Sequence, residues 1–384
     1  MLKIPEKIEK ILDILFQNGF EAYIVGGCVR DMLMGKTPND YDVTTSAKPE
    51  DIIRIFEKTV PTGIKHGTIT VISEGLPVEV TTYRTEADYT DHRRPDKIEF
   101  VTSLKQDLAR RDFTVNAMAY NNQNGLQDFF DGKADLENKI LRAVGDAKTR
   151  FNEDALRILR LFRFAATLGF ECEKNTLDAA IEYSYLLQNI SRERIFAELS
   201  KAVMGDNLKV LSPLIDSGAL CFLEIKKSVP LEQISKLKEK PDLRLTAFLY
   251  STSINAVQTL KLLKASNHQI DYADKFTRLF PFLDTKERCK IKLMLSLSSE
   301  EILLDYFSYL ECMGCDMHLQ RQIVKEVLQN NEPYLLSHLK IDGNTLIKMG
   351  YEGSQIGKIL NKLLLRVLEY PDLNNEKDLK SEIS

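Results

Sequence analysis

The chain has 384 residues and a formal net charge of −4, with 43% hydrophobic and 28% charged residues. This length allows two or more packed units, and the composition is that of an ordinary soluble protein. The weakly acidic balance excludes a protein that coats nucleic acid through bulk positive charge, so any RNA site must be a local patch. No stretch is apolar enough to span a membrane, and the N-terminus lacks the uninterrupted apolar core of a signal peptide. We therefore expect a cytoplasmic protein with no membrane contact.

The six cysteines are scattered, which predicts free thiols in a chain of this size without a secretion signal. Cys312 and Cys315 precede His318 at a spacing that resembles half of a zinc site. No second ligand pair accompanies them in the sequence, and the segment has a helical pattern. We therefore expect no structural zinc.

A helix is predicted near the N-terminus from the apolar spacing of Ile8, Ile11, Leu12, Leu15 and Phe16. The short apolar run 23–25 then predicts a strand that ends at Gly26 and Gly27. Two residues without a Cβ allow a sharp bend and a close approach of the backbone to another molecule. A helix is expected to start at once, which would direct backbone N–H groups toward the turn. Arg30 lies one turn along this helix, so the segment predicts a phosphate-binding corner.

Two carboxylates follow in the segment DYDVTT, at Asp40 and Asp42. The two-residue period of a strand would place both side chains on one face. Neighbouring carboxylates repel each other unless a cation or a proton lies between them, and near neutral pH Mg²⁺ is the natural partner. A glycine turn, an arginine and a carboxylate pair together predict phosphoryl or nucleotidyl transfer with bound metal.

These motifs resemble the signature of the template-independent nucleotidyltransferases, namely the tRNA CCA-adding enzymes and their bacterial poly(A) polymerase relatives. The resemblance rests on GGCVRD, NDYDVTTSA, RRDFTVNAMAY, DGKADLENKILRAVGD and EDALRILRLFRFAA, and it is strong over the first half of the chain. It implies addition of CCA to tRNA 3′ ends from CTP and ATP, with Mg²⁺ at Asp40 and Asp42. A-adding, CC-adding and poly(A) polymerase activities on the same scaffold remain alternatives, as does a non-catalytic RNA-binding protein.

The rest of the head is predicted to contain a helix from Ser46 to Lys58 and a hairpin of strands 68–73 and 78–82. Glu79 points opposite to its valine neighbours on the second strand. Spacing alone favours an exposed strand glutamate, whereas the resemblance favours a third catalytic carboxylate. The charged segment 84–97 lacks apolar periodicity and predicts an exposed loop. In the helix after Ser103, the resemblance implies that Arg111 grips the triphosphate, and Gly27 and Arg30 are expected to bind nucleotide as well.

A second constellation is predicted on one helix from Asn152 to Leu168, which Gly169 ends. Its other positions are nearly all apolar, so its polar stripe is expected to face a pocket rather than solvent. An ordinary ion pair between Asp154 and Arg157 is the simplest alternative. A carboxylate can accept from the exocyclic amine that cytosine and adenine share, while arginine donates to ring acceptors. The resemblance assigns base selection to Asp154 and Arg157, orientation to Glu153, and nucleotide contacts to Arg160 and Arg163.

The fold class expected from these patterns is α+β, with a mixed-sheet head at 1–146, a helical neck at 147–204 and an all-helical body and tail at 205–384. No strand pattern returns after Ala147. Arg192 and Arg194, in a segment that resembles a bracing element of the family, are expected to be structural. The body and tail are expected to bind tRNA. Near the C-terminus, a helix that begins before Ile356 could hold RNA phosphates or could simply pack through an amphipathic face.

Overall fold

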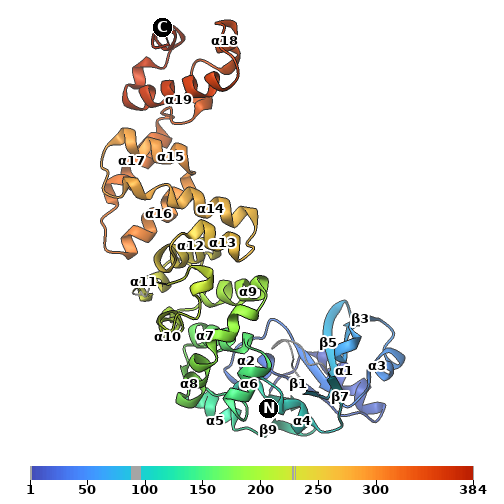
Figure 1. Ribbon diagram of the computed structural model, residues 1–384. Helices are drawn as coiled ribbons and strands as arrows, with labels where there is room; N and C mark the ends of the chain where they lie inside the picture. Colours follow the sequence, from blue (N-terminus) through green and yellow to red (C-terminus); the bar gives the residue numbers. More distant parts are fainter. Residues whose placement is uncertain (1, 88–96, 227–228, 230, 384) are drawn as a thin grey trace. The chain divides into compact units, whose positions relative to one another are not determined.

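The computed structural model describes residues 2–87, 97–226, 229 and 231–383. The chain forms two compact units, Met1–Phe222 and Leu223–Ser384. The first combines a mixed sheet with helices, and the second is built from helices over its described part (Figure 1). This confirms the α+β class. The expected head and neck both belong to the first unit, so a boundary between them at residue 146 stays a prediction.

The first unit contains both the sheet and the helices expected to read the base. Its helices are α1 (Glu6–Gln17), α2 (Gly27–Leu33), α3 (Pro49–Ile55), α4 (Leu104–Ala109), α5 (Gly132–Glu137), α6 (Ala147–Glu153), α7 (Leu156–Leu168), α8 (Lys174–Glu182), α9 (Arg192–Ala202) and α10 (Ser212–Asp216). Its strands are β1 (Ala22–Val25), β2 (Asp42–Thr45), β3 (Thr59–Gly63), β4 (Thr68–Ser73), β5 (Leu76–Thr82), β6 (Arg84–Ala87), β7 (Lys97–Phe100), β8 (Met118–Asn121), β9 (Gly125–Asp128), β10 (Ile140–Leu141) and β11 (Glu171–Cys172). Short 3₁₀ turns are η1 (Ile64–His66), η2 (Thr114–Asn116), η3 (Ser184–Asn189) and η4 (Leu208–Leu211).

The main sheet has seven strands in the order β3-β4-β5-β2-β1-β8-β9. All neighbours in it are antiparallel except β2 and β5, which run parallel in the centre. The predicted β4–β5 hairpin and the strand before the glycine turn are confirmed. The apolar face of α1 buries Ile8, Ile11, Leu12 and Leu15, as its helical spacing predicts.

Several predicted boundaries in the head were wrong. The helix expected over 46–58 is shorter, because α3 starts at Pro49 and the chain then forms the edge strand β3, which was missed. The segment expected as a loop pairs at its two ends, as β6 with β7, and residues 88–96 of that loop lie outside the described part. A strand also returns after Ala147, since β11 pairs in parallel with β10. Two-residue strands carry too little alternation to be seen in a sequence.

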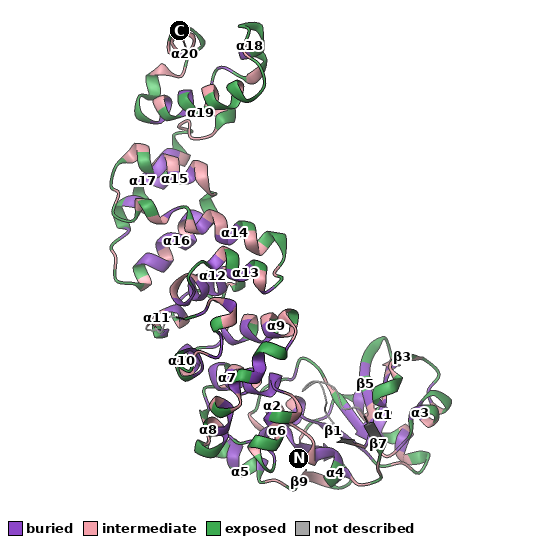
Figure 2. Cartoon of the chain, in the orientation of Figure 1, coloured by how far each residue is buried: buried purple, intermediate pink, exposed green. Residues whose placement is uncertain are grey.

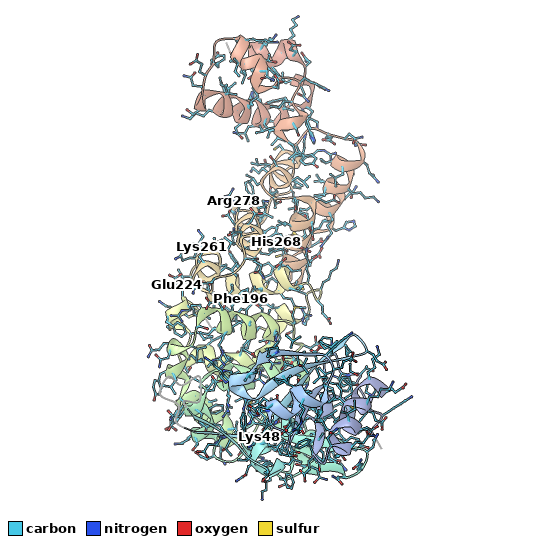
Figure 3. All side chains as sticks on the ribbon, turned by 90° about the vertical axis from the view of Figure 1, so that its right-hand side faces the viewer. Lys48, Phe196, Glu224, Lys261, His268 and Arg278 are labelled. Carbon is cyan, nitrogen blue, oxygen red and sulfur yellow. The ribbon has the colours of Figure 1, made fainter. Side chains whose placement is uncertain are left out.

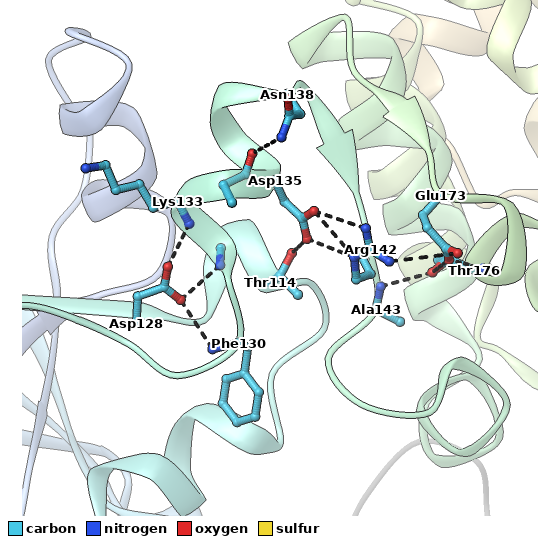
Figure 4. Close-up of polar contacts among 12 residues, drawn as sticks. Thr114, Asp128, Phe130, Lys133, Asp135, Asn138, Arg142, Ala143, Glu173 and Thr176 are labelled. Atoms are coloured by element: carbon cyan, nitrogen blue, oxygen red, sulfur yellow. Dashed lines mark hydrogen bonds and ion pairs between the residues drawn. The ribbon is translucent and has the colours of Figure 1, made fainter.

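A chain of polar contacts joins the sheet-bearing part of the first unit to α8, running from the buried Asp135 to the more exposed Arg142 (Figure 4). The carboxylate of Asp135 on α5 accepts from the Thr114 hydroxyl at 2.7 Å and from Nε of Arg142 at 3.1 Å. Arg142 also lies 3.9 Å from Glu173, which caps α8 by accepting from the backbone N–H of Thr176. These contacts hold the short β10–β11 pair in place where the sequence alone gives little propensity for strand.

The second unit is helical throughout its described residues. Its helices are α11 (Glu232–Ser235), α12 (Pro241–Thr252), α13 (Ala256–Leu262), α14 (Asn267–Thr277), α15 (Arg288–Leu297), α16 (Glu300–Cys312), α17 (His318–Gln329), α18 (Gly343–Lys348), α19 (Ser354–Glu369) and α20 (Glu376–Ser381). Short 3₁₀ turns are η6 (Phe280–Phe282), η7 (Leu336–His338) and η8 (Pro371–Leu373), while η5 (Cys221–Leu223) spans the division between units. Figure 2 shows buried residues concentrated along α12 and α16, and many exposed ones on α19.

One buried cation in the second unit lacks good partners. Lys292 on α15 has a side chain only 1% exposed, and its Nζ has no hydrogen-bond partner. The nearest acid is Glu332 at 3.5 Å, which Arg288 already holds at 2.5 Å. Burial lowers the pKa of Lys292 from its ordinary value of 10.5, although Glu332 opposes the shift. The protonated amine therefore costs free energy in the folded state.

Lys292→Met is expected to leave the free energy of unfolding unchanged or to raise it by about 1–4 kcal/mol, because Glu332 keeps Arg288 as its partner. In the parent protein, stability should rise with pH between the lowered pKa and 10.5, since the unfolded chain binds more protons there. The variant should lose that slope. Urea unfolding at pH 7 and pH 9.5 measures both effects, with the exposed Lys290→Met as control. A loss above about 2 kcal/mol would show that Lys292 stabilises the fold.

Candidate active site

The turn between β1 and α2 is built from two glycines that admit close neighbours. Gly26 has a φ of 82°, which favours glycine, and Gly27 begins α2. A Cβ on Gly26 would lie 3.0 Å from Nη1 of Arg111, and one on Gly27 would lie 3.6 Å from Nη2 of Arg30. The turn thus brings together two guanidinium groups from distant parts of the sequence, which is the charge a phosphate requires.

The two arginines at this turn differ in their partners. Arg30 is 9% exposed and donates from Nε and Nη2 to Asp31, at 2.9 and 2.7 Å, and from Nη1 to Asn116 at 2.6 Å. It fastens α2 to η2, so a phosphate would have to compete for donors already in use. A direct role for Arg30 in nucleotide binding stays a prediction.

Arg111, by contrast, has a buried Nε without a hydrogen-bond partner. Its closest acid is Asp107, at 3.8 Å. Burial lowers the pKa of Arg111, whereas the charges of Asp107 and Asp42 raise it. An unsatisfied buried donor is unfavourable, and an incoming anion would satisfy it. Of the two, Arg111 fits the expected role in triphosphate binding better.

The three predicted carboxylates line one cavity of about 540 Å³, formed by residues between 39 and 42, residues of β4 and β5, and Ile8. Asp42 opens β2 and is the direct partner of Glu79 on the parallel strand β5, so their side chains share a face. Asp40 was expected within this strand, and that was wrong because β2 begins at Asp42. Asp40 nevertheless lines the same cavity.

The electrostatics of Asp42 reflect this crowding of charge. Surrounding protein atoms raise the pKa of Asp42, Arg111 lowers it, and Asp40 raises it further. The neighbouring Cys28 is a buried thiol that donates to the carbonyl of Val25 at 3.3 Å. Burial raises its pKa to about 11, so it stays protonated near neutral pH and is a poor metal ligand.

Oxygen donors of this kind suit a hard divalent cation. Within the described ranges, no three His, Cys, Asp or Glu side chains are grouped so that they could hold a metal ion by themselves. Mg²⁺ is usually held by one or two carboxylates together with substrate phosphates and waters, and rarely by an all-protein cage. The pair Asp40 and Asp42, with Glu79 beside it, fits this pattern.

The predicted base-reading helix is interrupted at Asp154. The segment 152–168 forms the end of α6 and the whole of α7, with Asp154 in an extended conformation between them (φ −136°, ψ 100°). The single helix expected there was therefore wrong. At this break, Asp154 pairs with Arg194 of α9 at 2.9 Å. Arg157 pairs instead with Glu153 at 2.8 Å, so the ion pair considered between Asp154 and Arg157 is not formed.

Arg160 and Arg163 also point to protein partners. Arg160 donates to Asp112 at 2.8 Å, and Arg163 donates to Glu198 of α9 at 2.5 Å. Both guanidinium groups lie over the ring of Phe164, 5.2 and 3.8 Å from its centroid. As predicted, the apolar residues of α7 are buried (Figure 2). The two arginines thus bind α7 to its neighbours, and nucleotide contacts by them stay a prediction.

Arg194 was expected to be structural, but its partner, and the supporting roles of Asp112, Asn116 and Glu198, were not predicted from the sequence. Asp112, Asn116 and Glu198 hold the arginines of the site, and Arg194 holds the carboxylate of Asp154. The only available signal was the polar pattern in RRDFTVNA and SRERIFAEL, each within an apolar context. Partners 35 to 86 residues apart cannot be inferred from spacing.

The second unit has a cavity of about 1200 Å³, lined by residues of α12, α13, α14 and α16, including Lys261. Figure 3 labels Lys261, His268 and Arg278, which are exposed side chains of this region. Arg278 pairs with Asp274 at 2.5 Å, and His268 lies 3.7 Å from Asp242. A neighbouring acid therefore offsets the charge of Arg278. In the part of the chain that the structure describes, no helix is long and apolar enough to cross a membrane.

Comparison with known proteins agrees with this geometry. Residues 22–142 match the family model described as the poly(A) polymerase head domain, and residues 169–224 match a probable RNA- and SrmB-binding site of polymerase A. The chain is 37% identical to the CCA-adding enzyme of Pediococcus pentosaceus, over 97% of this chain and 96% of that protein. It is 38% identical to the CCA-adding enzyme of Streptococcus gordonii, over 95% and 94%.

A solved structure extends the likeness to three dimensions. The Bacillus stearothermophilus CCA-adding enzyme in complex with CTP superposes with a TM-score of 0.80 at 28% identity, covering 98% of this chain and 97% of that one. With matching sequence over nearly the whole length, the chain belongs to the CCA-adding enzymes, a family of nucleotidyltransferases.

Proposed function

We propose that this protein adds CCA to the 3′ end of tRNA, using CTP and ATP and releasing pyrophosphate. The observation that carries the proposal is the in-register pair Asp42 and Glu79 beside a glycine turn that Arg111 approaches. The similar Bacillus enzyme was solved with CTP, which supports a nucleotide at this corner. In the reaction, the RNA 3′-oxygen attacks the α-phosphorus of the NTP, the bond from that phosphorus to pyrophosphate breaks, and the proton of the 3′-hydroxyl passes to water.

Asp40 and Asp42 are proposed to hold Mg²⁺, with Glu79 as a further carboxylate. The bound metal would stabilise negative charge on the attacking and leaving oxygens, as in two-metal transfer. Burial is the main reason that the pKa of Asp42 is raised, and a cation would relieve the repulsion by Asp40 that adds to it. Arg111 would bind the triphosphate through its unpaired donor, and the buried surroundings strengthen that interaction.

The tRNA is proposed to contact the helices that follow the head, at a cytoplasmic location. The match of residues 169–224 to an RNA-binding family model supports this for the first unit. In the second unit, α19 buries Leu363, Leu364, Val367 and Leu368, so it packs through an amphipathic face. Its Lys358 and Lys362 stay exposed and remain available for phosphates.

The test is an addition assay with purified protein and tRNA that ends before CCA, after C and after CC. Each NTP is supplied separately and in combination, and products are resolved to single nucleotides. Stepwise addition of C, C and A supports the proposal. Addition of A alone or of CC alone would indicate a partial activity, and long A tails would indicate a poly(A) polymerase. If no product formed in Mg²⁺, the protein would be a non-catalytic RNA-binding protein.

Base choice is proposed to reside in Asp154 and Arg157. Asp154→Asn replaces an acceptor-only carboxylate with an amide that also donates, so keto oxygens of uracil and guanine would no longer be refused. The ratio of kcat/KM for CTP over UTP should fall about ten- to a hundredfold. Asp146→Asn, which changes the N-cap of α6, is the matched control and should leave that ratio unchanged. Equal losses for all four NTPs would contradict base reading by Asp154.

A further inference from the structure

Each carboxylate oxygen of Asp154 accepts a hydrogen bond from a different donor. Its Oδ1 accepts from the backbone N–H of Leu156 at 3.1 Å, and its Oδ2 accepts from Nη2 of Arg194 at 2.9 Å. The residue lies in extended backbone between α6 and α7, and the hydrogen bonds of its backbone to Arg150 and Arg157 leave the direction of the side chain to the partners of the carboxylate. The direction of the carboxylate is therefore fixed by one backbone donor and one guanidinium.

Arg157 is supported separately. Its Nη1 donates to Glu153 at 2.8 Å and to the carbonyl of Arg150 at 3.2 Å, and its Nη2 donates to the carbonyl of Arg110 at 2.9 Å. The donor group of the pair is thus anchored by α6 and by the segment after α4. The acceptor group, Asp154, depends on α9. Because Asp154 and Arg157 have different partners, a substitution can remove the contacts of one residue and leave those of the other in place.

Arg194 carries a donor that its ion pair with Asp154 does not use. Its side chain is 26% exposed, but its Nη1 is buried without a hydrogen-bond partner. Buried donors that serve only to hold a fold are nearly always satisfied. A guanidinium carries its donors in a rigid fork, so Arg194 can keep an Asp154 oxygen in place while presenting a second donor to an acceptor beside it.

We infer that Arg194 is a positioning residue that aims the Asp154 carboxylate at the base and so sets nucleotide selectivity. The inference rests on the proposed function and adds to it a selectivity role for α9. Without Arg194, the carboxylate would turn more freely and would present its acceptors to the exocyclic amine less often. Correct NTPs would lose rate, while incorrect ones, which gain nothing from the aimed carboxylate, would lose less.

The experiment measures kcat/KM for all four NTPs on tRNA that ends before CCA, in the parent protein and in Arg194→Met and Arg194→Lys. For Arg194→Met, the ratio of CTP over UTP is expected to fall about tenfold, the order of one charge-assisted hydrogen bond. Arg194→Lys keeps the charge but loses the fork, so a fall of about threefold is expected. If Arg194→Met does not fold, as judged by circular dichroism, Arg194→Lys carries the test, and an unchanged ratio overturns the inference.

The control is Arg142→Met, which removes a more exposed arginine of the first unit that pairs with the buried Asp135 (Figure 4). It should lower stability without changing the ratio. In Asp154→Asn, adding Arg194→Met should change the ratio no further, because the carboxylate to be aimed is gone. Equal losses for all NTPs in Arg194→Met, or additive effects in the double variant, overturn the inference. A parent protein that adds no nucleotide would instead refute the proposed function.

Discussion

Asp42→Ala is expected to abolish addition of both C and A, lowering kcat/KM by at least about a thousandfold. Asp42 lies where three carboxylates line one cavity, in register with Glu79. The expected metal would stabilise charge in the transition state whichever base is added, so both steps should fail together. Losing one preorganised stabiliser costs roughly 10²- to 10³-fold in other enzymes, and losing a metal ligand should cost more.

The fold should survive this change, because Asp42 is exposed at the start of β2. Single-turnover rates for CTP and ATP in Mg²⁺, with circular dichroism as a check on folding, measure the effect. Asp51→Asn is a matched control, since Asp51 pairs with the neighbouring surface residue Arg54 on α3. Near-normal rates in Asp42→Ala, or loss of A addition alone, would remove the assignment of Asp42 to the shared chemistry.

Asp112→Asn is expected to destabilise the first unit by about 1.5–3 kcal/mol. Asp112 is a buried carboxylate that accepts from Arg160 at 2.8 Å and from Asn116 at 3.1 Å. Asn116 in turn accepts from Arg30, so one carboxylate ties α7 to the glycine turn. The amide keeps the shape but removes the charge, and Arg160 would be left with Glu198 at 3.8 Å, a residue that already serves Arg163.

The pH dependence gives this prediction a second readout. Burial alone would raise the pKa of Asp112, but Arg160, Asn116 and the Phe113 N–H together lower it from 3.8 to about 2. The unfolded chain therefore binds more protons between these values, and stability is lost as the pH falls from about 4 toward 2. The stability difference between parent and variant should shrink over the same range.

Urea unfolding followed by circular dichroism at pH 7 and pH 3 measures both effects, and hydrogen exchange of α7 amides confirms that the loss is in the first unit. Asp178→Asn, which breaks an exposed pair with Lys174 on α8, is the control and should change stability by less than about 1 kcal/mol. If Asp112→Asn also lowered the free energy of unfolding by less than about 1 kcal/mol, the ion pair of Asp112 with Arg160 would not be needed for stability.

Local chemistry made much of the head predictable. The glycine turn, the strand before it and the β4–β5 hairpin follow from residues whose preferences act over a few positions. The position of Glu79 opposite its valine neighbours also follows from strand alternation, although its pairing with Asp42 does not. The apolar surface of α7 was predictable for the same reason, since helical periodicity determines which residues must be buried.

Where the prediction failed, the deciding contacts were distant in sequence. Nothing in the segment 152–168 signals a break at Asp154, because the break is stabilised by Arg194, 40 residues away. The edge strand β3 and the pair β10–β11 form because neighbours complete their hydrogen bonds, with little help from their own propensity.

The sequence by itself determined the fold class, the helical and strand periods around the site, and the set of charged groups that nucleotidyl transfer needs, because these depend on residue type and short spacing. Only the tertiary structure decided which charges meet. It committed Arg30, Arg160 and Arg163 to Asp31, Asp112 and Glu198, and it left Arg111 with an unpaired buried donor. A charged side chain acquires a specific role only when burial removes water from it and a particular partner takes the place of that water. The partner is determined by which distant segments of the chain pack together.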